Sequence, residues 1–191
     1  MSSRAVQAPG PARDFSIAAV LRDGSRVTIR ALRPDDRQRL MEAFRLLDAD
    51  SVYTRFFMHR SGFSETEIER SINVDFVSEV ALAVTIEAAG VERLIAVGRY
   101  FVLGGGAAEV AFVVEEDYQG RGIASRLLAC LAVLGRAQGI TRFEADVMAR
   151  NNSMLAVFDR SGFPVHRRVE GNVAHLTLTL DAPDGEPGEA P

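Results

Sequence analysis

The sequence lacks lysine and tryptophan altogether and contains a single cysteine, so all 22 of its basic residues are arginines. One cysteine, Cys130, excludes an internal disulfide framework and a zinc site built from several cysteines. We therefore expect a reducing, cytoplasmic setting. No apolar run approaches the roughly 18 residues that a membrane-spanning helix needs. Residues 1–14 also lack the apolar stretch of a secretory signal, and we expect no membrane partner.

What is present is the composition of an ordinary globular chain. Of the 191 residues, 47% are hydrophobic and 25% are charged, and this length suits one domain. A formal net charge of −4 leaves no basic excess, so we expect no nucleic-acid partner. Residues 1–14 show no periodicity, and residues 181–191 combine Pro, Gly and acids, a composition that cannot support packing. We predict disordered tails at 1–14 and 181–191 and one domain over 15–180.

The hydrophobic periodicity of this domain predicts an α+β fold. A strand is followed by three helices, three strands, a helix, a strand, a helix and two strands. This order favours a mixed, mostly antiparallel sheet flanked by helices over a regular βαβ alternation. The predicted strands are 27–32, 80–86, 94–103, 108–114, 142–148, 165–169 and 173–180, and the predicted helices begin at Pro34 and at the Ser64 cap or cover 51–58, 122–138 and 152–160.

The most informative stretch is 108–124, where a strand, a glycine loop and an amphipathic helix follow one another. Gly120 and Gly122 allow a sharp turn that exposes consecutive N–H groups at the helix start, where the helix dipole is positive. Such a loop is a cradle for phosphate. Arg121 could add a charge-assisted bond, and a solvated loop arginine is an equal alternative.

Two familiar phosphate-binding motifs do not fit this loop. A Walker A motif needs a lysine, which the chain lacks. A dinucleotide fingerprint needs Gly or Ala where Ser125 stands, and it needs an almost immediate turn where residues 115–119 intervene.

At these residues the sequence resembles the GNAT superfamily of acyl-CoA-dependent N-acetyltransferases. The family signature stands here as Gln119, Gly122 and Ala124, followed by the helix, a strand, Asn151 and the segment 161–163. The resemblance covers 27–180 and implies a GNAT-like fold with acetyl-CoA as co-substrate, its pyrophosphate bound in the loop. The cofactor-binding residues that it implies are Phe112, Val113, Val114, Gln119, Gly120, Arg121, Gly122, Ile123, Ala124 and Asn151, with backbone N–H groups around Val113 and Val114 as oxyanion donors. Asn151 is equally well explained as a helix N-cap.

Glu109 is the candidate catalytic residue. It shares one face of its strand with Ala111 and Val113, and both faces are apolar, so burial should raise the pKa of its carboxyl. An amine acceptor with a pKa near ~10.4 must lose a proton before it can attack, and such a carboxylate can accept it. The family resemblance likewise implies a general base here. The alternatives are a solvated Glu109 at the strand start and Asp146 as the base.

One position departs from the family pattern. Phe158 stands where many members place the tyrosine that protonates the leaving thiolate, so no general acid is assigned. The string Tyr53-Thr54-Arg55-Phe56-Phe57 resembles the Tyr-x-Arg-Phe-Phe motif of bacterial Pat-type protein-lysine acetyltransferases, which implies a protein lysine as acceptor. A small-molecule amine acetyltransferase and a non-catalytic acyl-CoA sensor remain as alternatives.

The histidines and the cysteine are best explained without a catalytic or metal-binding role. His59, His166 and His175 are scattered without ligand spacing, so we expect no metal. Cys130 lies among leucines, which favours a buried small hydrophobic residue over a nucleophile.

Overall fold

The computed structural model describes residues 12–45 and 65–180 of the chain. One eight-stranded sheet runs through this part in the order β1-β2-β3-β4-β5-β6-β8-β7. β5 and β6 are parallel, and every other pairing between described strands is antiparallel. The strands are β1 (Ser16–Val20), β2 (Arg26–Ala31), β3 (Glu79–Ala88), β4 (Val91–Gly104), β5 (Ala107–Val114), β6 (Arg142–Met148), β7 (Val165–Glu170) and β8 (Val173–Thr179).

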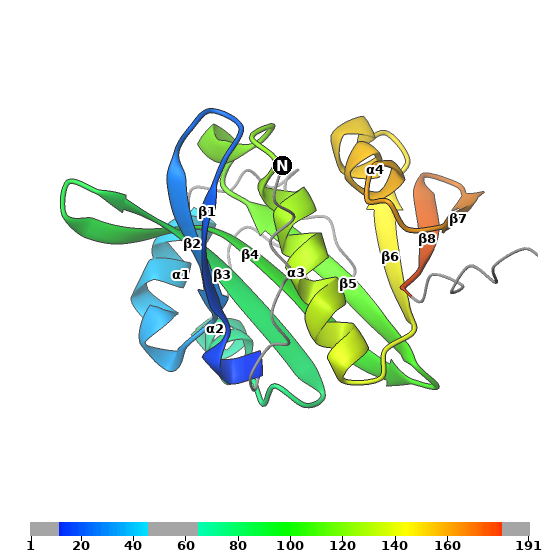
Figure 1. Cartoon of the computed structure of the whole chain (residues 1–191), viewed down its shortest axis with the longest axis horizontal. Helices are drawn as coiled ribbons and strands as arrows, with labels where there is room; N and C mark the ends of the chain where they lie inside the picture. The colour runs from blue at the N-terminus through cyan, green and yellow to red at the C-terminus, as the bar shows by residue number, and fades with distance from the viewer. Residues whose placement is uncertain (1–11, 46–64, 181–191) are drawn as a thin grey trace, which may run out of the picture.

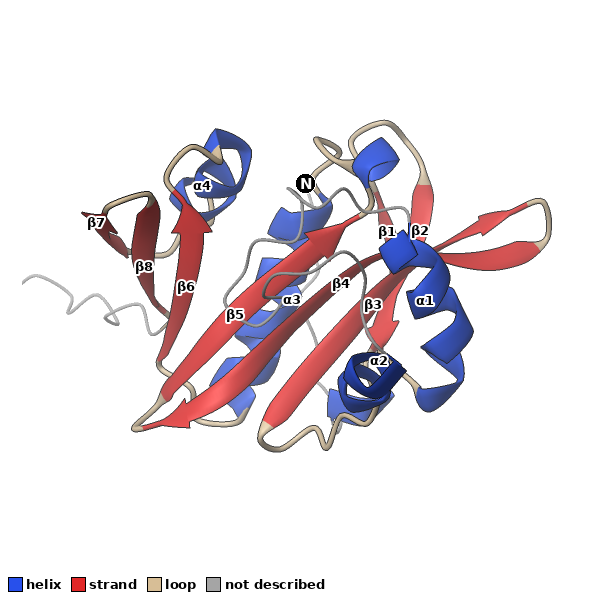
Figure 2. Ribbon diagram, turned by 180° about the vertical axis from the view of Figure 1, so that it is seen from behind, coloured by secondary structure: helices blue, strands red, loops and turns tan. Residues whose placement is uncertain are grey.

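Helices cover both faces of this sheet. Figure 2 shows α1 and α2 in front of it and α3 behind, and Figure 1 shows α4 above the end of β6. None of the helices in the described segments is both long and apolar enough to cross a bilayer. The helices are η1 (Ala12–Asp14), η2 (Pro34–Asp36), α1 (Arg37–Arg45), α2 (Glu65–Ile72), η4 (Glu116–Tyr118), α3 (Ile123–Ala137) and α4 (Asn152–Asp159).

Two apolar cores occupy the two faces of the sheet. On one face, Leu127 of α3 packs in the same cluster as Phe112 of β5. On the other, Leu40 of α1 and Ile72 of α2 share a cluster with Val113 of β5. Successive side chains of a strand point to opposite faces, so β5 supplies apolar residues to both cores. The sequence predicted such a doubly buried strand, and the burial pattern confirms it.

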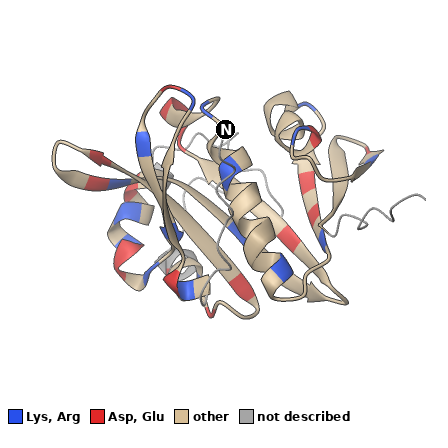
Figure 3. Ribbon diagram, viewed as in Figure 1, with Lys and Arg blue, Asp and Glu red and all other residues tan. Residues whose placement is uncertain are grey.

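The helix α3 presents the predicted apolar stripe to the sheet. Its charged residues, Arg126 and Arg136, lie toward its two ends (Figure 3). Gly98 of β4 allows close packing, because a Cβ there would lie 3.0 Å from the ring of Phe112 and 3.2 Å from Cβ of Leu127. The stripe consists of Ile123, Leu127, Leu128, Leu131 and Leu134, all of them buried.

The predicted α+β class with a mixed, mostly antiparallel sheet is confirmed. The expected strand order is wrong in one respect, because it omitted β1. This edge strand is short, and residues 17–20 are all apolar although Ile17 is 41% and Val20 50% exposed, so no alternation of apolar and polar residues marks it as a strand. Residues 12–14, at the end of the expected tail, form η1 with Ala12 buried. The predicted helix 51–58, the Ser64 cap and the motif 53–57 lie outside the described residues.

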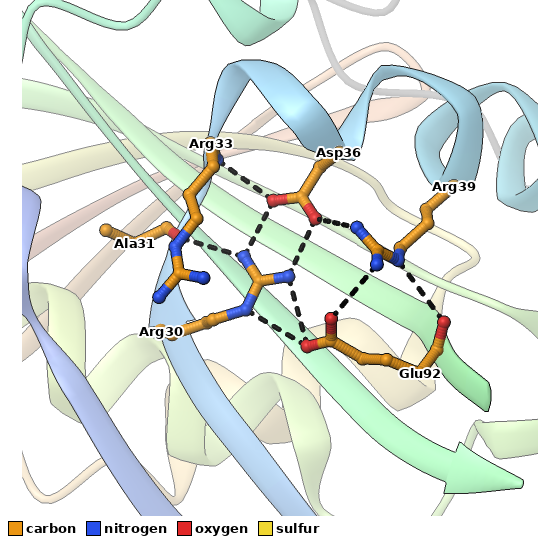
Figure 4. Close-up of polar contacts among 6 residues, drawn as sticks. All are labelled: Arg30, Ala31, Arg33, Asp36, Arg39 and Glu92. Atoms are coloured by element: carbon orange, nitrogen blue, oxygen red, sulfur yellow. Dashed lines mark hydrogen bonds and ion pairs between the residues drawn. The ribbon is translucent and has the colours of Figure 1, made fainter. Parts of the chain in front are cut away.

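A buried network of ion pairs joins η2 and the start of α1 to the sheet strands β2 and β4 (Figure 4). The guanidinium of Arg30 meets both carboxylate oxygens of Asp36 at 2.7 Å. Asp36 also accepts the Arg33 amide at 2.9 Å and Arg39 at 3.2 Å. Glu92 of β4 pairs with Arg30 at 3.1 Å. Burial alone would raise the pKa of Asp36, but the hydrogen bonds and charges of these arginines hold it below its ordinary value.

A groove between the glycine loop, the strand gap and α4

The strands β5 and β6 pair over a short distance and then separate (Figure 2). Their parallel register joins Ala107–Glu109 to Arg142–Glu144. β5 continues to Val114 and β6 to Met148, and no pairing joins these later parts. A gap therefore opens beyond Glu109 and exposes one backbone edge of β5.

The backbone of β5 directs particular amides into this gap. The N–H of Glu115 donates to the carbonyl of Ile95 on β4 at 2.9 Å. Since N–H groups alternate between the two edges of a strand, the amides of Phe112 and Val114 point toward the gap and that of Val113 toward β4. Among the expected oxyanion donors, Val114 thus faces the gap, whereas both the amide and the buried side chain of Val113 face elsewhere.

A groove of ≈ 370 Å³ continues from the gap. The end of β5, the glycine loop with the start of α3, α4 and the β1–β2 hairpin form its walls. It is lined by Arg22, Phe112, Val114, Tyr118, Gln119, Gly120, Gly122, Ile123, Ala124, Ser125, Asn151, Ser153, Met154, Ala156, Val157 and Arg160.

The glycine loop adopts the conformation that its sequence predicts. Gly120 has φ +73° and Gly122 φ +87°, values that favour glycine. Gly122 is the N-cap of α3 and provides no side-chain cap, so the first amides of the helix have no partner within it. Gln119 folds back to donate to the Val114 carbonyl at 3.2 Å. The loop is thus a set of open N–H groups at the positive end of a helix, which suits an anion.

Arg121, expected at the phosphate, turns away from the groove. Its guanidinium pairs with Asp23 at 2.6 Å and donates to the Asp117 carbonyl at 2.7 Å. It also lies over the ring of Tyr118, 4.8 Å from the centroid. Arg22 and Arg160 line the groove instead. Neither arginine could be identified from the sequence, because nothing in its local sequence distinguishes it from a solvated arginine.

Asn151 combines the two roles considered for it. Its side-chain oxygen accepts the Met154 amide at 3.0 Å, which makes it the N-cap of α4, and the residue also lines the groove. Phe158, on the same helix, is 1% exposed and packs against Phe112 with ring centroids 6.1 Å apart. The position at which the family resemblance implied a tyrosine is thus filled by an apolar side chain that packs in the core.

Glu109 is the last residue of β5 that pairs with β6, so it stands where the gap begins. It is partly buried, on the face that α1 and α2 cover, and opposite Phe101 of β4. On the same face of β4, buried Arg99 pairs with Glu79 at 2.7 Å. Glu109 does not line the groove, and its side chain lies on the opposite face of β5 from that of Phe112, which does. The raised pKa expected for Glu109 stays a prediction.

A second acidic residue has a partner that the sequence did not reveal. Nδ1 of His175 on β8 lies 2.6 Å from the carboxylate of Asp146 on β6. No cluster of three or more possible metal ligands occurs in segments 12–45 and 65–180. Cys130 is buried, and burial raises the pKa of its thiol to about 11, so the thiol is protonated at neutral pH.

Comparisons with known proteins agree with this arrangement. A family model described as the acetyltransferase (GNAT) family matches residues 46–163. Acetyltransferase Pat of Mycolicibacterium smegmatis is 33% identical over 148 residues, which make up 76% of this chain and 44% of that protein. This chain therefore spans less than half the length of that relative.

Solved structures show the same fold. The GNAT domain of S. lividans PAT superposes with a TM-score of 0.76 at 37% identity, covering 86% of this chain and 96% of that one. PaiA N-acetyltransferase of Thermoplasma acidophilum, solved with coenzyme A, has a TM-score of 0.63 at 17% identity over 80% of this chain and 98% of that one. The chain belongs to the acetyltransferase (GNAT) family.

Proposed function

We propose that this protein transfers the acetyl group of acetyl-CoA to an amine, with Glu109 as general base. One observation carries the proposal: a single groove runs from the open amides at the start of α3 to Phe112 and Val114, on the open edge of the strand that also carries Glu109. A ligand with phosphate at one end and a reactive acyl group at the other fits this arrangement. Acetyl-CoA is such a molecule.

Each part of the groove would serve a different part of acetyl-CoA. The amides of 120–124 would take the pyrophosphate. Asn151 and the apolar side chains of α4, such as Met154 and Val157, would flank the pantetheine arm. The amides of Phe112 and Val114 face the gap, where they are available to a developing oxyanion.

The reaction that this geometry supports is direct transfer. Glu109 accepts a proton from the ammonium of the acceptor, and the neutral nitrogen attacks the thioester carbonyl. A C–N bond forms, the C–S bond breaks and CoA leaves as the thiolate. The nitrogen, positively charged after the attack, gives up its second proton to solvent or to the departed thiolate, which leaves the neutral amide. Because thiols ionise near ~8.5, the thiolate can leave without a general acid, and Phe158 offers none.

We further propose a protein lysine as acceptor, in a cytoplasmic setting without nucleic-acid or membrane partners. The similarity to Pat acetyltransferases and the string 53–57 support this acceptor. The alternatives, a small-molecule amine as acceptor and an acyl-CoA sensor without activity, are separated by experiment. The sensor alternative draws on Phe158, which cannot donate a proton.

The test mixes the protein with acetyl-CoA and a panel of lysine peptides and small amines, and follows thiol release. Glu109→Gln should lower turnover by about 10²- to 10⁴-fold, the usual contribution of a general base, while CoA still raises the melting temperature. Asp146→Asn tests the second candidate base, and Glu87→Gln, at the exposed end of β3, is the control.

Full activity of Glu109→Gln would overturn the assignment of the base. Stabilisation by CoA without thiol release from any amine would favour the sensor. If CoA does not raise the melting temperature at all, both the acetyltransferase and the sensor hypotheses are wrong. Incubation with a cell lysate, followed by mapping of newly acetylated lysines, would identify a protein acceptor.

A further inference from the structure

The β1–β2 hairpin is fastened to the glycine loop although the two segments are far apart in sequence. The Arg22 amide donates to the Arg121 carbonyl at 3.3 Å. The Arg121 guanidinium pairs with Asp23 at 2.6 Å, across 98 residues of chain. Arg126 of α3 donates to the Val20 carbonyl. The hairpin is therefore a wall of the groove.

Asp23 is well suited to hold this tether. Its carboxylate accepts the Ser25 amide at 3.0 Å within the hairpin turn. Hydrogen bonds from Ser25, followed by the charge of Arg121, hold the pKa of Asp23 below its ordinary value. Asp23 is thus ionised at neutral pH, and the positive charge of Arg121 is balanced by it.

Arg22, which immediately precedes Asp23 in the hairpin turn, lies against Gly122. Its Nε lies 3.2 Å from where a Cβ on Gly122 would be, so its side chain crosses the start of α3. Arg22 lines the groove and forms no ion pair with any residue of the described segments. An unpaired guanidinium thus stands beside the open amides of the loop.

The lining of the groove is one-sided in charge. Among the residues that the structure describes, Arg22 and Arg160 line it, and no Asp or Glu does. The nearest carboxylate of the hairpin, Asp23, is engaged by Arg121. A groove with two cations, open amides and no lining carboxylate attracts an anion.

We propose that Arg22 is a phosphate-binding residue of this groove, and that Arg121 acts as the positioning residue that holds Arg22 in place. The inference rests on the proposed use of acetyl-CoA. Because Arg22 lies over Gly122, at the first turn of α3, it would bind the pyrophosphate rather than the 3′-phosphate. The glycine loop and the β1–β2 hairpin then form the two sides of one anion-binding site.

Binding measured by isothermal titration calorimetry on the full chain tests this role. Arg22→Ala should weaken CoA binding about 10- to 100-fold, the equivalent of losing one hydrogen bond to a charged group. Arg22→Lys should recover part of the loss, since it keeps the charge but not the fork of donors. Arg26→Ala is the matched control, because Arg26 lies on the same hairpin, is exposed and does not line the groove.

Shortened ligands identify the phosphate that Arg22 contacts. Dephospho-CoA, which lacks the 3′-phosphate, should show the same loss with Arg22→Ala as CoA does. Pantetheine, which lacks all phosphates, should bind wild type and Arg22→Ala alike. A loss confined to CoA, absent with dephospho-CoA, would contradict the assignment to the pyrophosphate.

The tether is tested with Arg121→Ala and Asp23→Asn. Both should weaken CoA binding by the same factor and by less than Arg22→Ala, and the double variant should add nothing further. If Arg121→Ala costs more than Arg22→Ala while Asp23→Asn is neutral, Arg121 itself binds the phosphate and the proposal is wrong.

Failure of this inference differs from failure of the proposed function. If the wild type binds no CoA, the use of acetyl-CoA is wrong. If the wild type binds CoA and Arg22→Ala binds it equally well, with circular dichroism showing that both are folded, only the role of Arg22 is wrong.

Discussion

Arginine serves opposite purposes in two regions of this molecule. In the buried network, Arg30 is surrounded by the carboxylates of Asp36 and Glu92, and Asp36 is 0% exposed (Figure 4). In the groove, Arg22 and Arg160 lie on a surface to which segments 12–45 and 65–180 contribute no carboxylate. In the first region the charges are paired within the protein, whereas in the second we propose that a bound anion pairs with them.

This difference indicates which charges support the fold and which support function. A buried charge must be paired, because an unpaired one costs several kcal/mol. A solvated charge can stay unpaired at little cost and is available to a ligand. Changes in the network should therefore alter stability and leave CoA affinity unchanged, and changes in the groove should do the reverse.

The largest effect is expected from Asp36→Asn. It should lower the free energy of unfolding by about 3–5 kcal/mol, since it removes the carboxylate that pairs with buried Arg30. Urea denaturation measures this change. Asp35→Asn, in the same turn but exposed, is the control and should change stability by less than ~0.5 kcal/mol. A loss of CoA affinity in folded Asp36→Asn would break the separation between the two regions.

The same pair should carry a pH dependence with a definite sign. The pKa of Asp36 lies below its ordinary value of 3.8, so the folded state holds the ionised form more tightly than the unfolded state does. Its contribution is fully present above the unfolded pKa and is lost as the pH falls through the folded pKa. The stability difference between wild type and Asp36→Asn should thus be constant near neutral pH and shrink below about pH 4. A difference that grows on acidification would contradict this sign.

Gly122→Ala tests the role of the groove, because it changes the loop beside Arg22 and leaves the buried ion-pair network intact. The backbone strain should cost about 1–2 kcal/mol, and the added Cβ would lie 3.2 Å from Nε of Arg22 and displace it. Gly90→Ala, at φ +77° with nothing within 4 Å, carries the strain alone. Both variants should lose similar stability in denaturation, and Gly122→Ala alone should bind CoA more weakly. If Gly122→Ala and Gly90→Ala bind CoA with equal affinity, the position of Arg22 beside Gly122 does not contribute to CoA binding.

The smallest effect is expected from Asn151→Ala. Loss of the N-cap of α4 should cost about 1 kcal/mol, because the Met154 amide loses its acceptor. Asn152→Ala, one position later and exposed, is the control. A thermal melt that shows equal stability for the two variants would deny Asn151 its capping role.

Much of the site could be predicted because its signals are local. The turn at Gly120 and Gly122 and the apolar stripe of α3 follow from residue types a few positions apart. The doubly apolar pattern of β5 likewise marked Glu109 as unusual. Strand β1 could not be predicted in this way, since its five residues are too few and too uniformly apolar to show an alternation.

The sequence by itself determined the fold class, the glycine turns of the loop before α3 and the strand that carries Glu109, because neighbouring residues decide backbone conformation and periodicity. Only the tertiary structure decided which arginine faces the groove and that Asp146 meets His175. The physical reason is that ion pairs join groups distant in sequence. Arg121 is engaged by Asp23 and Arg22 is left beside Gly122 because the hairpin folds against the loop across 98 residues.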